Sequence, residues 1–318
     1  MGDKVRPGSI EKNLLFHLLI VLLLLAAFLP ASAAGETIGV IMPGDIPYYR
    51  EIHAAFVSRL NKSGLGEGVE IIVQRPYADS ISLSNAARKL IALDVDVIVT
   101  YGAPATFAAT GEKSKIPIVY ASVYDPLVQR IRSKVVTGVS SKASPSSLLR
   151  YLKGCATLST LGVIYSAGEQ DSVYQMRELL KLSEQYGFRV EAIDLKRHQE
   201  AKTVLAGRKL DAIFVTSSTI ANMASSPIAD FAREQRIPTA SLLPDMTGHV
   251  TITLSANPKD QGERTAEIMK RLLDGAQPEN IRADSQGTVD LVFNLKEAQR
   301  MGFRIPMELV TEATRLVQ

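Results

Sequence analysis

Loops that follow short apolar runs in the first half of the chain carry residues suited to binding a small molecule. Tyr48 lies beside two prolines, and its ring could form a wall against an apolar group. Gly102 allows the backbone to approach a ligand closely. Ala105 and Thr106 begin a predicted helix, where free backbone N–H groups favour an anion such as a carboxylate. The alternative for this helix start is an ordinary cap without ligand contact.

A further loop of the first half combines an aromatic ring with a carboxylate. Tyr124 offers a second ring, and Asp125 could pair with a ligand ammonium. Asp125 is equally interpretable as a turn or cap residue before Pro126. Tyr48, in turn, could simply pack on the helix that it begins. Both interpretations stay open for each residue.

Polar residues occupy the corresponding loops of the second half. Asp171 and Ser172 follow an apolar run and open a predicted helix, and both are candidates for polar ligand contacts. Ser217 and Ser218 belong to four consecutive hydroxyl residues at 216–219, which could bind a carboxylate or sugar hydroxyls. Alternatively, Ser218 is only the N-cap of the following helix.

The sequence contains no pattern for catalysis, cofactor binding or metal binding. No dinucleotide-binding glycine motif follows a strand, and no P-loop, H-E-x-x-H or G-x-S-x-G is present. After the N-terminal segment the only histidines are His53, His198 and His249, which share no ligand spacing. Cys155 is predicted to be structural. We therefore expect no catalytic residues, no metal and no cofactor.

Composition and charge narrow the class of protein. The 318 residues are 46% hydrophobic and 22% charged, which is typical of globular domains, and the length allows two of them. The formal net charge of +3 argues against a dedicated nucleic-acid binder. A single cysteine excludes an intramolecular disulfide.

The first 33 residues resemble a secretory signal peptide in three parts. Lys4, Arg6 and Lys12 precede an unbroken apolar run at 18–29, and Ala-Ser-Ala at 31–33 suits cleavage. The run is short for a membrane span, although an uncleaved anchor is the alternative. We expect a periplasmic or otherwise extracytoplasmic protein.

Short β-branched runs alternate with helical patterns in the rest of the chain, which predicts βαβ units and a parallel sheet. The run TLGVIY at 160–165 matches TIGVIM at 37–42, 209–218 matches 94–103, and 237–243 matches 116–122. The three strands recur in the same order at offsets of 123, 115 and 121 residues. This recurrence predicts a duplication that gives two similar α/β lobes.

The order of several segments resembles a known family. They include VDVIVTYGAPAT at 95–106, IPIVYASVYDP at 116–126, LGVIYSAGEQDSVYQM at 161–176, LDAIFVTSSTIAN at 210–222 and the tail at 291–313. The chain is similar to ABC-transporter substrate-binding proteins of the type I periplasmic binding fold, especially members that bind aromatic amino acids. It departs from them at 103–105, where Ala-Pro-Ala replaces a frequent Thr-Pro-Ser, and at Asp171, where many have Asn.

The resemblance implies two Rossmann-like lobes with parallel sheets, joined by a three-crossing hinge. Extended segments at 135–141, 249–255 and 288–294 are the expected crossings. Lobe 1 would then comprise 34–140 plus about 256–286, and lobe 2 would comprise 141–255 plus about 287–318.

The implied function is that of a monomeric, non-enzymatic solute-binding protein. An amino-acid-like or carboxylate-bearing ligand would be captured between the lobes by hinge closure and presented to an ABC permease. One alternative is a ligand-sensing subunit of a membrane receptor such as a sensor kinase. An exported α/β enzyme is a third, although no nucleophile–base pair is visible.

Overall fold

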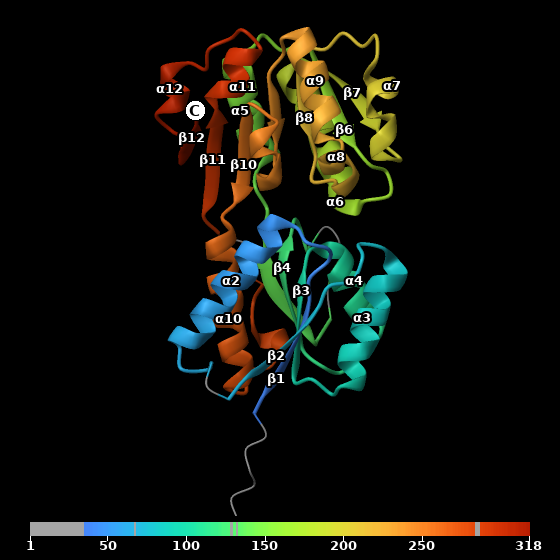
Figure 1. The fold of residues 1–318 in the computed structure, drawn as a ribbon, viewed down its shortest axis with the longest axis vertical. Helices are drawn as coiled ribbons and strands as arrows, with labels where there is room; N and C mark the ends of the chain where they lie inside the picture. The colour runs from blue at the N-terminus through green and yellow to red at the C-terminus, as the bar shows by residue number, and fades with distance from the viewer. Residues whose placement is uncertain (1–34, 67, 128–129, 132, 284–286) are drawn as a thin grey trace, which may run out of the picture. The chain divides into compact units, whose positions relative to one another are not determined.

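Two β-sheets organise the chain, as the ribbon of the computed structural model shows (Figure 1). The structure describes residues 35–318 except 67, 128–129, 132 and 284–286. The predicted signal peptide at 1–33 lies outside the described residues.

The first sheet has the strand order β2-β1-β3-β4-β5, and every neighbouring pair is parallel. Its helices α3 and α4 lie on one side, and α2 lies on the other (Figure 1). The elements are β1 (Thr37–Ile41), α2 (Pro47–Lys62), β2 (Glu70–Gln74), α3 (Ser80–Ala92), β3 (Val97–Tyr101), α4 (Ala103–Gly111), β4 (Ile118–Val123) and β5 (Val136–Ser140).

The second sheet has the order β12-β11-β10-β9-β8-β6-β7, and only the β10–β11 pair is antiparallel. Its first elements are α5 (Pro145–Cys155), β6 (Thr160–Tyr165), α6 (Gln170–Tyr186), β7 (Arg189–Asp194), η1 (His198–Glu200), α7 (Ala201–Leu205), β8 (Ala212–Val215) and α8 (Thr219–Met223). The others are α9 (Ser225–Gln235), β9 (Thr239–Ser241), η2 (Pro244–Gly248), β10 (Ile252–Ala256), β11 (Val289–Asn294), α11 (Leu295–Arg300), α12 (Met307–Val310) and β12 (Arg315–Val317).

Helix α10 (Pro258–Leu273) returns the chain to the first sheet. Its buried Ala266 and Met269 share a hydrophobic core with Ile52 and Phe56 of α2. After η3 (Pro278–Asn280) the chain continues into β11. The chain therefore passes between the two groups of elements three times: after β5, after β10 and before β11. This topology confirms the predicted two-lobe α/β fold with a three-crossing hinge.

The two lobes repeat the same strand order, because β7-β6-β8-β9-β10 follows the plan of β2-β1-β3-β4-β5. Gly39 in β1 and Gly162 in β6 occupy equivalent positions in register with β3 and β8. A Cβ atom on Gly39 would lie 2.9 Å from Leu90, and one on Gly162 would lie 2.5 Å from Leu210. Close packing of a leucine therefore explains a glycine in the first strand of each lobe. Strand β7, which occupies in the second sheet the position that β2 has in the first, and strand β12 were absent from the sequence prediction.

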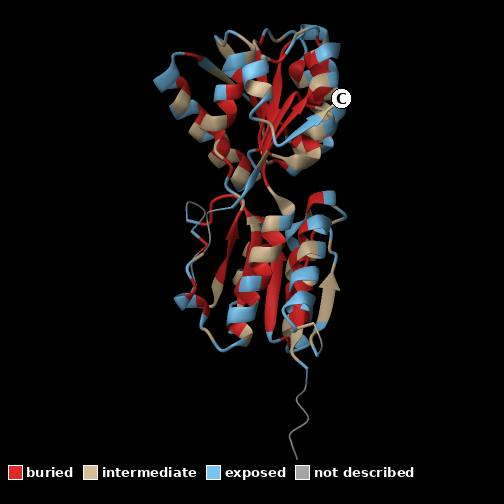
Figure 2. Cartoon of the chain, turned by 90° about the vertical axis from the view of Figure 1, so that its left-hand side faces the viewer, coloured by how far each residue is buried: buried red, intermediate tan, exposed pale blue. Residues whose placement is uncertain are grey.

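The central strands are buried on both faces, edge strands such as β2 and β12 are not, and helices are buried on one side (Figure 2). All five residues of β3 are buried, as expected for a central strand of a sheet covered on both faces. Helix α2 buries Tyr48, Ile52, Phe56 and Leu60, which recur every fourth residue along one side. This burial fixes the first residues of α2 next to the carboxyl ends of the strands.

Candidate functional site

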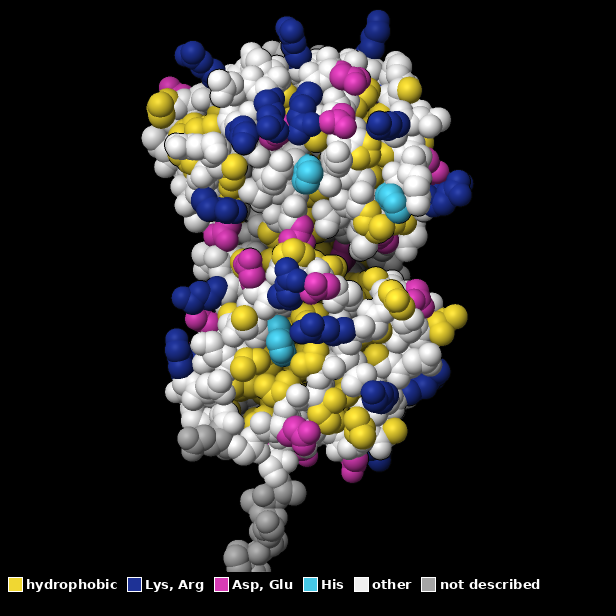
Figure 3. Space-filling view, viewed as in Figure 1, with side chains coloured by type: hydrophobic (Ala, Val, Ile, Leu, Met, Phe, Trp, Pro, Cys, Tyr) yellow, Lys and Arg dark blue, Asp and Glu magenta, His cyan; other side chains and the backbone are white. Residues whose placement is uncertain are grey.

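A cavity of about 740 Å³ lies where loops of both lobes meet. Its wall includes residues from the loops that follow β1, β3 and β4 in the first lobe and β6, β8 and β9 in the second. Ligands of open α/β sheets bind beyond the carboxyl ends of strands, which is where these loops lie. Hydrophobic and acidic side chains gather at the level where the lobes meet (Figure 3).

Two tyrosines at the start of α2 form part of the first-lobe wall. The Tyr48 hydroxyl donates to the carbonyl of Ala256 (3.0 Å), and the Tyr49 ring stacks on Tyr101 with 6.0 Å between centroids. Burial raises the pKa of both wall tyrosines. A Cβ on Gly102, whose φ is +80°, would lie 2.4 Å from the Tyr49 hydroxyl. Gly102 thus makes room for Tyr49 and does not itself line the cavity.

The start of α4 presents Ala103 and Pro104 to the cavity, together with Phe107 one turn later. Ala105 and Thr106 are completely buried and do not line it. The Thr106 hydroxyl donates to the Gly102 carbonyl (2.9 Å), and its backbone N–H bonds to the same oxygen (3.2 Å). These bonds lie within the first lobe.

The carboxyl end of β4 contributes Ser122 to the cavity wall, and the loop after this strand contributes Tyr124. Ser122 has a left-handed backbone with φ of +59°, at an irregularity in the pairing of β4 with β5. The Tyr124 hydroxyl donates to a carboxylate oxygen of Glu178 in α6 (3.3 Å). Asp125 lies outside the wall: it accepts from the Leu127 N–H (3.2 Å) and pairs with Lys142 (2.7 Å), as expected of a turn residue.

Asp171, Ser217 and Ser218 line the cavity from the second lobe. Ser218 also accepts from the Ala221 N–H (3.0 Å), which makes it the N-cap of α8. Ser172 is completely buried and does not line the cavity. Its hydroxyl accepts from the Ser166 N–H (2.8 Å) and lies 2.7 Å from the hydroxyl of Thr216.

Two more carboxylates line the same side. Glu169 accepts from the N–H groups of Thr219 (2.6 Å) and Ile220 (3.1 Å) at the start of α8. Burial raises the pKa of Glu169 despite these bonds. Burial also raises the pKa of Asp245 in η2, outweighing the backbone N–H of Tyr48, which lowers it.

Comparison with known families supplies the deciding observation: the model of the ABC transporter substrate-binding proteins matches residues 37–317. The chain belongs to this family. Its members are binding proteins and not enzymes, so this substrate-binding protein has a solute-binding role. No curated protein matches the sequence.

Solved structures share the fold of this substrate-binding protein. An ABC domain from Streptococcus pneumonia in complex with L-Trp is 22% identical, with a TM-score of 0.82, covering 89% of this chain and 100% of that one. A conserved domain protein from Vibrio cholerae is 20% identical, with a TM-score of 0.81, covering 89% and 99%. A ligand-free, open substrate-binding protein with adhesive properties from Clostridium difficile is 22% identical, with a TM-score of 0.72 and the same coverage. The fold is that of type I periplasmic binding proteins.

The structure brings half of the predicted ligand-binding residues of this substrate-binding protein into one wall: Tyr48, Tyr124, Asp171, Ser217 and Ser218. It leaves Gly102, Ala105, Thr106, Asp125 and Ser172 outside that wall. Ser122 and Phe107 line the cavity although the prediction omitted them. Ser122 sits in a loop that the sequence had already indicated, whereas nothing in the sequence reveals that Phe107 faces outward from α4.

The charge of the cavity wall is one-sided. Glu169, Asp171 and Asp245 line it, and no described lysine, arginine or histidine does. All three carboxylates contribute to the raised pKa of Tyr49, so their negative potential converges on that ring. Among the described residues, no group of three or more His, Cys, Asp or Glu could hold a metal ion. None of the described helices is both long and apolar enough to cross a membrane.

Proposed function

We propose that this substrate-binding protein captures a small amino-acid-like solute between its two lobes by hinge closure. A cavity with walls from both lobes is the observation that carries this proposal, because any molecule within it touches both sides of a three-crossing hinge. A ligand that contacts both lobes favours the closed form by its differential affinity. The closed form would then dock on an ABC permease.

The aromatic side of the cavity suits the apolar part of the ligand. Tyr48, Tyr49, Phe107 and Tyr124 supply rings from three different elements. Rings of this kind bury a large apolar area and stack on other rings. The solved relative from Streptococcus pneumonia holds L-Trp, a molecule with such a ring, which supports the proposal at the level of the fold.

The acidic side suits a positive charge on the ligand. Asp171 and Asp245 would face a ligand ammonium, and the ring of Tyr49 would attract the same cation through its face. A cation would also compensate the desolvated carboxylate of Asp245. We therefore place the ammonium of the ligand between Tyr49 and these two carboxylates.

A carboxylate on the ligand has one position that the chain's own acids leave open. The start of α8 already receives the carboxylate of Glu169, and α6 carries Asp171 in its first turn. At the start of α4 the first turn contains no acidic residue, and the backbone N–H of the cavity-lining Ala103 precedes the first bonded turn. We place the ligand carboxylate there.

A thermal-shift panel tests this function with residues 34–318. Each aromatic or aliphatic amino acid is compared with its decarboxylated amine and its deaminated acid. A ligand at a hundredfold excess over its dissociation constant stabilises the folded state by about 2.7 kcal/mol. We expect amino acids to raise the melting temperature most and deaminated acids least. A panel in which only deaminated acids bind would contradict the placement of the ammonium.

Hinge closure is tested separately by small-angle X-ray scattering with the best compound of the panel. We expect the radius of gyration to fall when the compound is added. The control is the same compound with a variant in which Tyr49→Ala removes the ring at the centre of the acidic side. An unchanged radius of gyration at saturation would contradict capture by hinge closure.

A further inference from the structure

Gln261 lies in the first turn of α10, directly after the second crossing of the hinge, and it is completely buried. The neighbouring Gly262 packs so closely on α2 that a Cβ there would lie 2.2 Å from the carbonyl oxygen of Ile52. This contact fixes α10 against the helix that carries Tyr48 and Tyr49. The side chain of Gln261 is therefore held at a defined place beside the cavity wall.

The amide of Gln261 joins two segments that are distant in sequence. Its Oε1 accepts from the backbone N–H of Ser122 (3.0 Å), across a separation of 139 residues. Its Nε2 donates to the backbone carbonyl of Ser140 (2.8 Å), across a separation of 121 residues. Ser122 lines the cavity, and Ser140 ends β5 immediately before the first crossing. One buried side chain thus links the cavity wall to two of the three crossings.

The backbone conformation of Ser122 needs the support of neighbouring groups. A left-handed backbone is unfavourable for a residue other than glycine, so it persists where the surroundings hold it. Ser122 lines the cavity together with Tyr48 and Tyr49, and its side chain opposes part of the rise that burial causes in the pKa of both phenols. The residue that Gln261 holds therefore belongs to the same cavity wall as both tyrosines of the proposed ligand site.

The second crossing is itself tied to the third. The Asn257 side chain donates to Asp290 (2.9 Å), and its backbone N–H donates to the carbonyl of Thr288 (2.9 Å). Motion of the lobes must therefore involve the segments that flank α10 together. Gln261 sits between these segments and the cavity.

We propose that Gln261 is a positioning residue that couples the ligand-facing Ser122 to the hinge. The inference rests on the proposed function, since it assigns a route by which a contact at the wall reaches the crossings. The role needs a neutral amide, because one atom must accept from Ser122 while the other donates to Ser140. Loss of the bond to Ser122 frees the backbone of that residue, and loss of the bond to Ser140 loosens the first crossing relative to α10.

The test measures the hinge without any ligand. Exposed Ile81 and Met223 are replaced by Cys for spin labelling, because the adjacent Ser80 and Asn222 line the cavity from opposite lobes. Burial raises the pKa of the native Cys155 thiol to about 11, and Cys155→Ser removes its residual reactivity. The distribution of distances between the labels is then recorded by pulsed electron paramagnetic resonance.

The variants are Gln261→Met, which removes both bonds, and Gln261→Glu, which keeps the acceptor and removes the donor. The matched control is Thr265→Val, one turn further along α10, where a completely buried hydroxyl donates to the carbonyl of Gln261 within the helix (2.6 Å). We expect both Gln261 variants to broaden the distribution, whereas Thr265→Val keeps the parental width. Affinity for the best compound of the panel should fall about tenfold in both Gln261 variants.

An unchanged distribution in folded Gln261→Met or Gln261→Glu overturns the proposal, as does equal broadening in Thr265→Val. Gln261→Glu is close to isosteric, so it carries the test if Gln261→Met fails to fold. The label distances require no ligand. Their result is therefore separate from that of the compound panel, and failure of the proposed function is distinguishable from failure of the role of Gln261.

Discussion

The two lobes present the same strand order to the cavity and a different chemistry. The first lobe lines it mainly with rings and small apolar side chains, and its α4 begins with Ala-Pro-Ala. The second lobe adds hydroxyls and all three carboxylates beside apolar residues such as Leu242 and Leu243, and its α8 begins after Thr-Ser-Ser. The repeated strand order gives both lobes the same scaffold, while the first residues after each strand decide what each wall can recognise.

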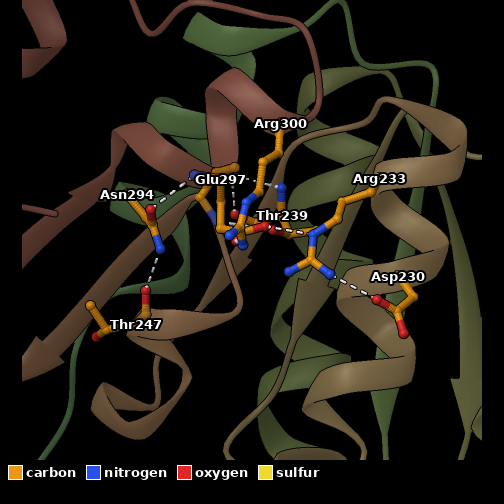
Figure 4. Close-up of polar contacts among 8 residues, drawn as sticks. Asp230, Arg233, Thr239, Thr247, Asn294, Glu297 and Arg300 are labelled. Carbon is orange, nitrogen blue, oxygen red and sulfur yellow. Dashed lines mark hydrogen bonds and ion pairs between the residues drawn. The ribbon is translucent and has the colours of Figure 1, made fainter. Parts of the chain in front are cut away.

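A second contrast lies within the second lobe, between Glu297 and Asp245. Glu297 of α11 is buried and accepts from Arg233 of α9 (2.8 Å) and from Arg300 of its own helix (2.5 Å), so the bond to Arg233 connects α11 to α9 (Figure 4). Burial opposes its ionisation, but the two arginines outweigh burial and lower its pKa. At Asp245 burial prevails and the pKa is raised. At Glu297 the chain itself supplies the cations that compensate the buried carboxylate. At Asp245 we propose that a cationic group of the ligand does so.

The largest expected effect is on stability, from Glu297→Gln. We expect a loss of about 2–3 kcal/mol, below the usual range for a broken buried pair because both arginines are partly exposed. Since the pKa of Glu297 is lowered, its contribution is complete above the usual carboxyl pKa and is lost as pH falls through the lowered value. Urea unfolding of the parent and of Glu297→Gln at several pH values measures the loss of stability and its dependence on pH.

The matched control for Glu297 is Asp230→Asn, which removes a more exposed partner of the same Arg233. It should cost less than about 1 kcal/mol. Equal losses in the two variants would abolish the contrast between the structural carboxylate and ordinary surface pairs.

Equivalent glycines in the two lobes come next. Gly39→Ala should destabilise by about 1–3 kcal/mol, since three branch atoms of the completely buried Leu90 lie 2.9–3.1 Å from the new Cβ. Gly162→Ala should cost less, because one methyl of Leu210 makes the only approach under 3.4 Å among its nearest atoms, and that methyl can turn away. Thermal unfolding of both variants ranks them, and a larger loss for Gly162→Ala would show that the second lobe is the more tightly packed.

Removing one cavity carboxylate tests the acidic wall. Asp245→Asn should weaken the best compound of the panel about tenfold, as expected for a lost charged contact of about 1.5 kcal/mol. In the parent, affinity for a cation should fall as pH decreases through the raised pKa of Asp245, because the proton removes the attracting charge. Isothermal titration calorimetry across pH checks both effects.

Asp125→Asn is the control for this substitution, since Asp125 lies in the turn with Lys142 and outside the wall. It should leave affinity and its pH dependence unchanged. A loss of affinity like that of Asp245→Asn would return Asp125 to the ligand site.

The smallest effects separate two hydroxyls at equivalent helix starts. Thr106→Val should cost about 1 kcal/mol of stability and leave affinity unchanged, because its hydroxyl is bonded inside the first lobe. Ser217→Ala should weaken binding a few-fold, roughly the worth of one hydrogen bond, with unchanged stability. Thermal melting measures the stability of both variants, and ligand titration measures their affinity. Weaker binding in Thr106→Val together with lower stability in Ser217→Ala would show that Thr106, and not Ser217, faces the ligand.

The sequence alone determined the alternation of strands and helices, the repeated order of three strands and the loops in which a ligand would be sought. These features depend on local periodicity and on glycine, proline and cap residues, which short segments carry by themselves. It also narrowed the expected chemistry, since the sequence contains none of the catalytic or metal-binding motifs named above.

Only the tertiary structure decided which residues of those loops face the cavity. Thr106 turns into the lobe while Phe107, the next residue, faces out, because the packing of α4 on its sheet selects one side of the helix. Ser122 adopts a left-handed backbone that its residue type disfavours, and Gln261 holds it from 139 positions away. Contacts over such separations arise only when the chain is folded, so no local pattern encodes them.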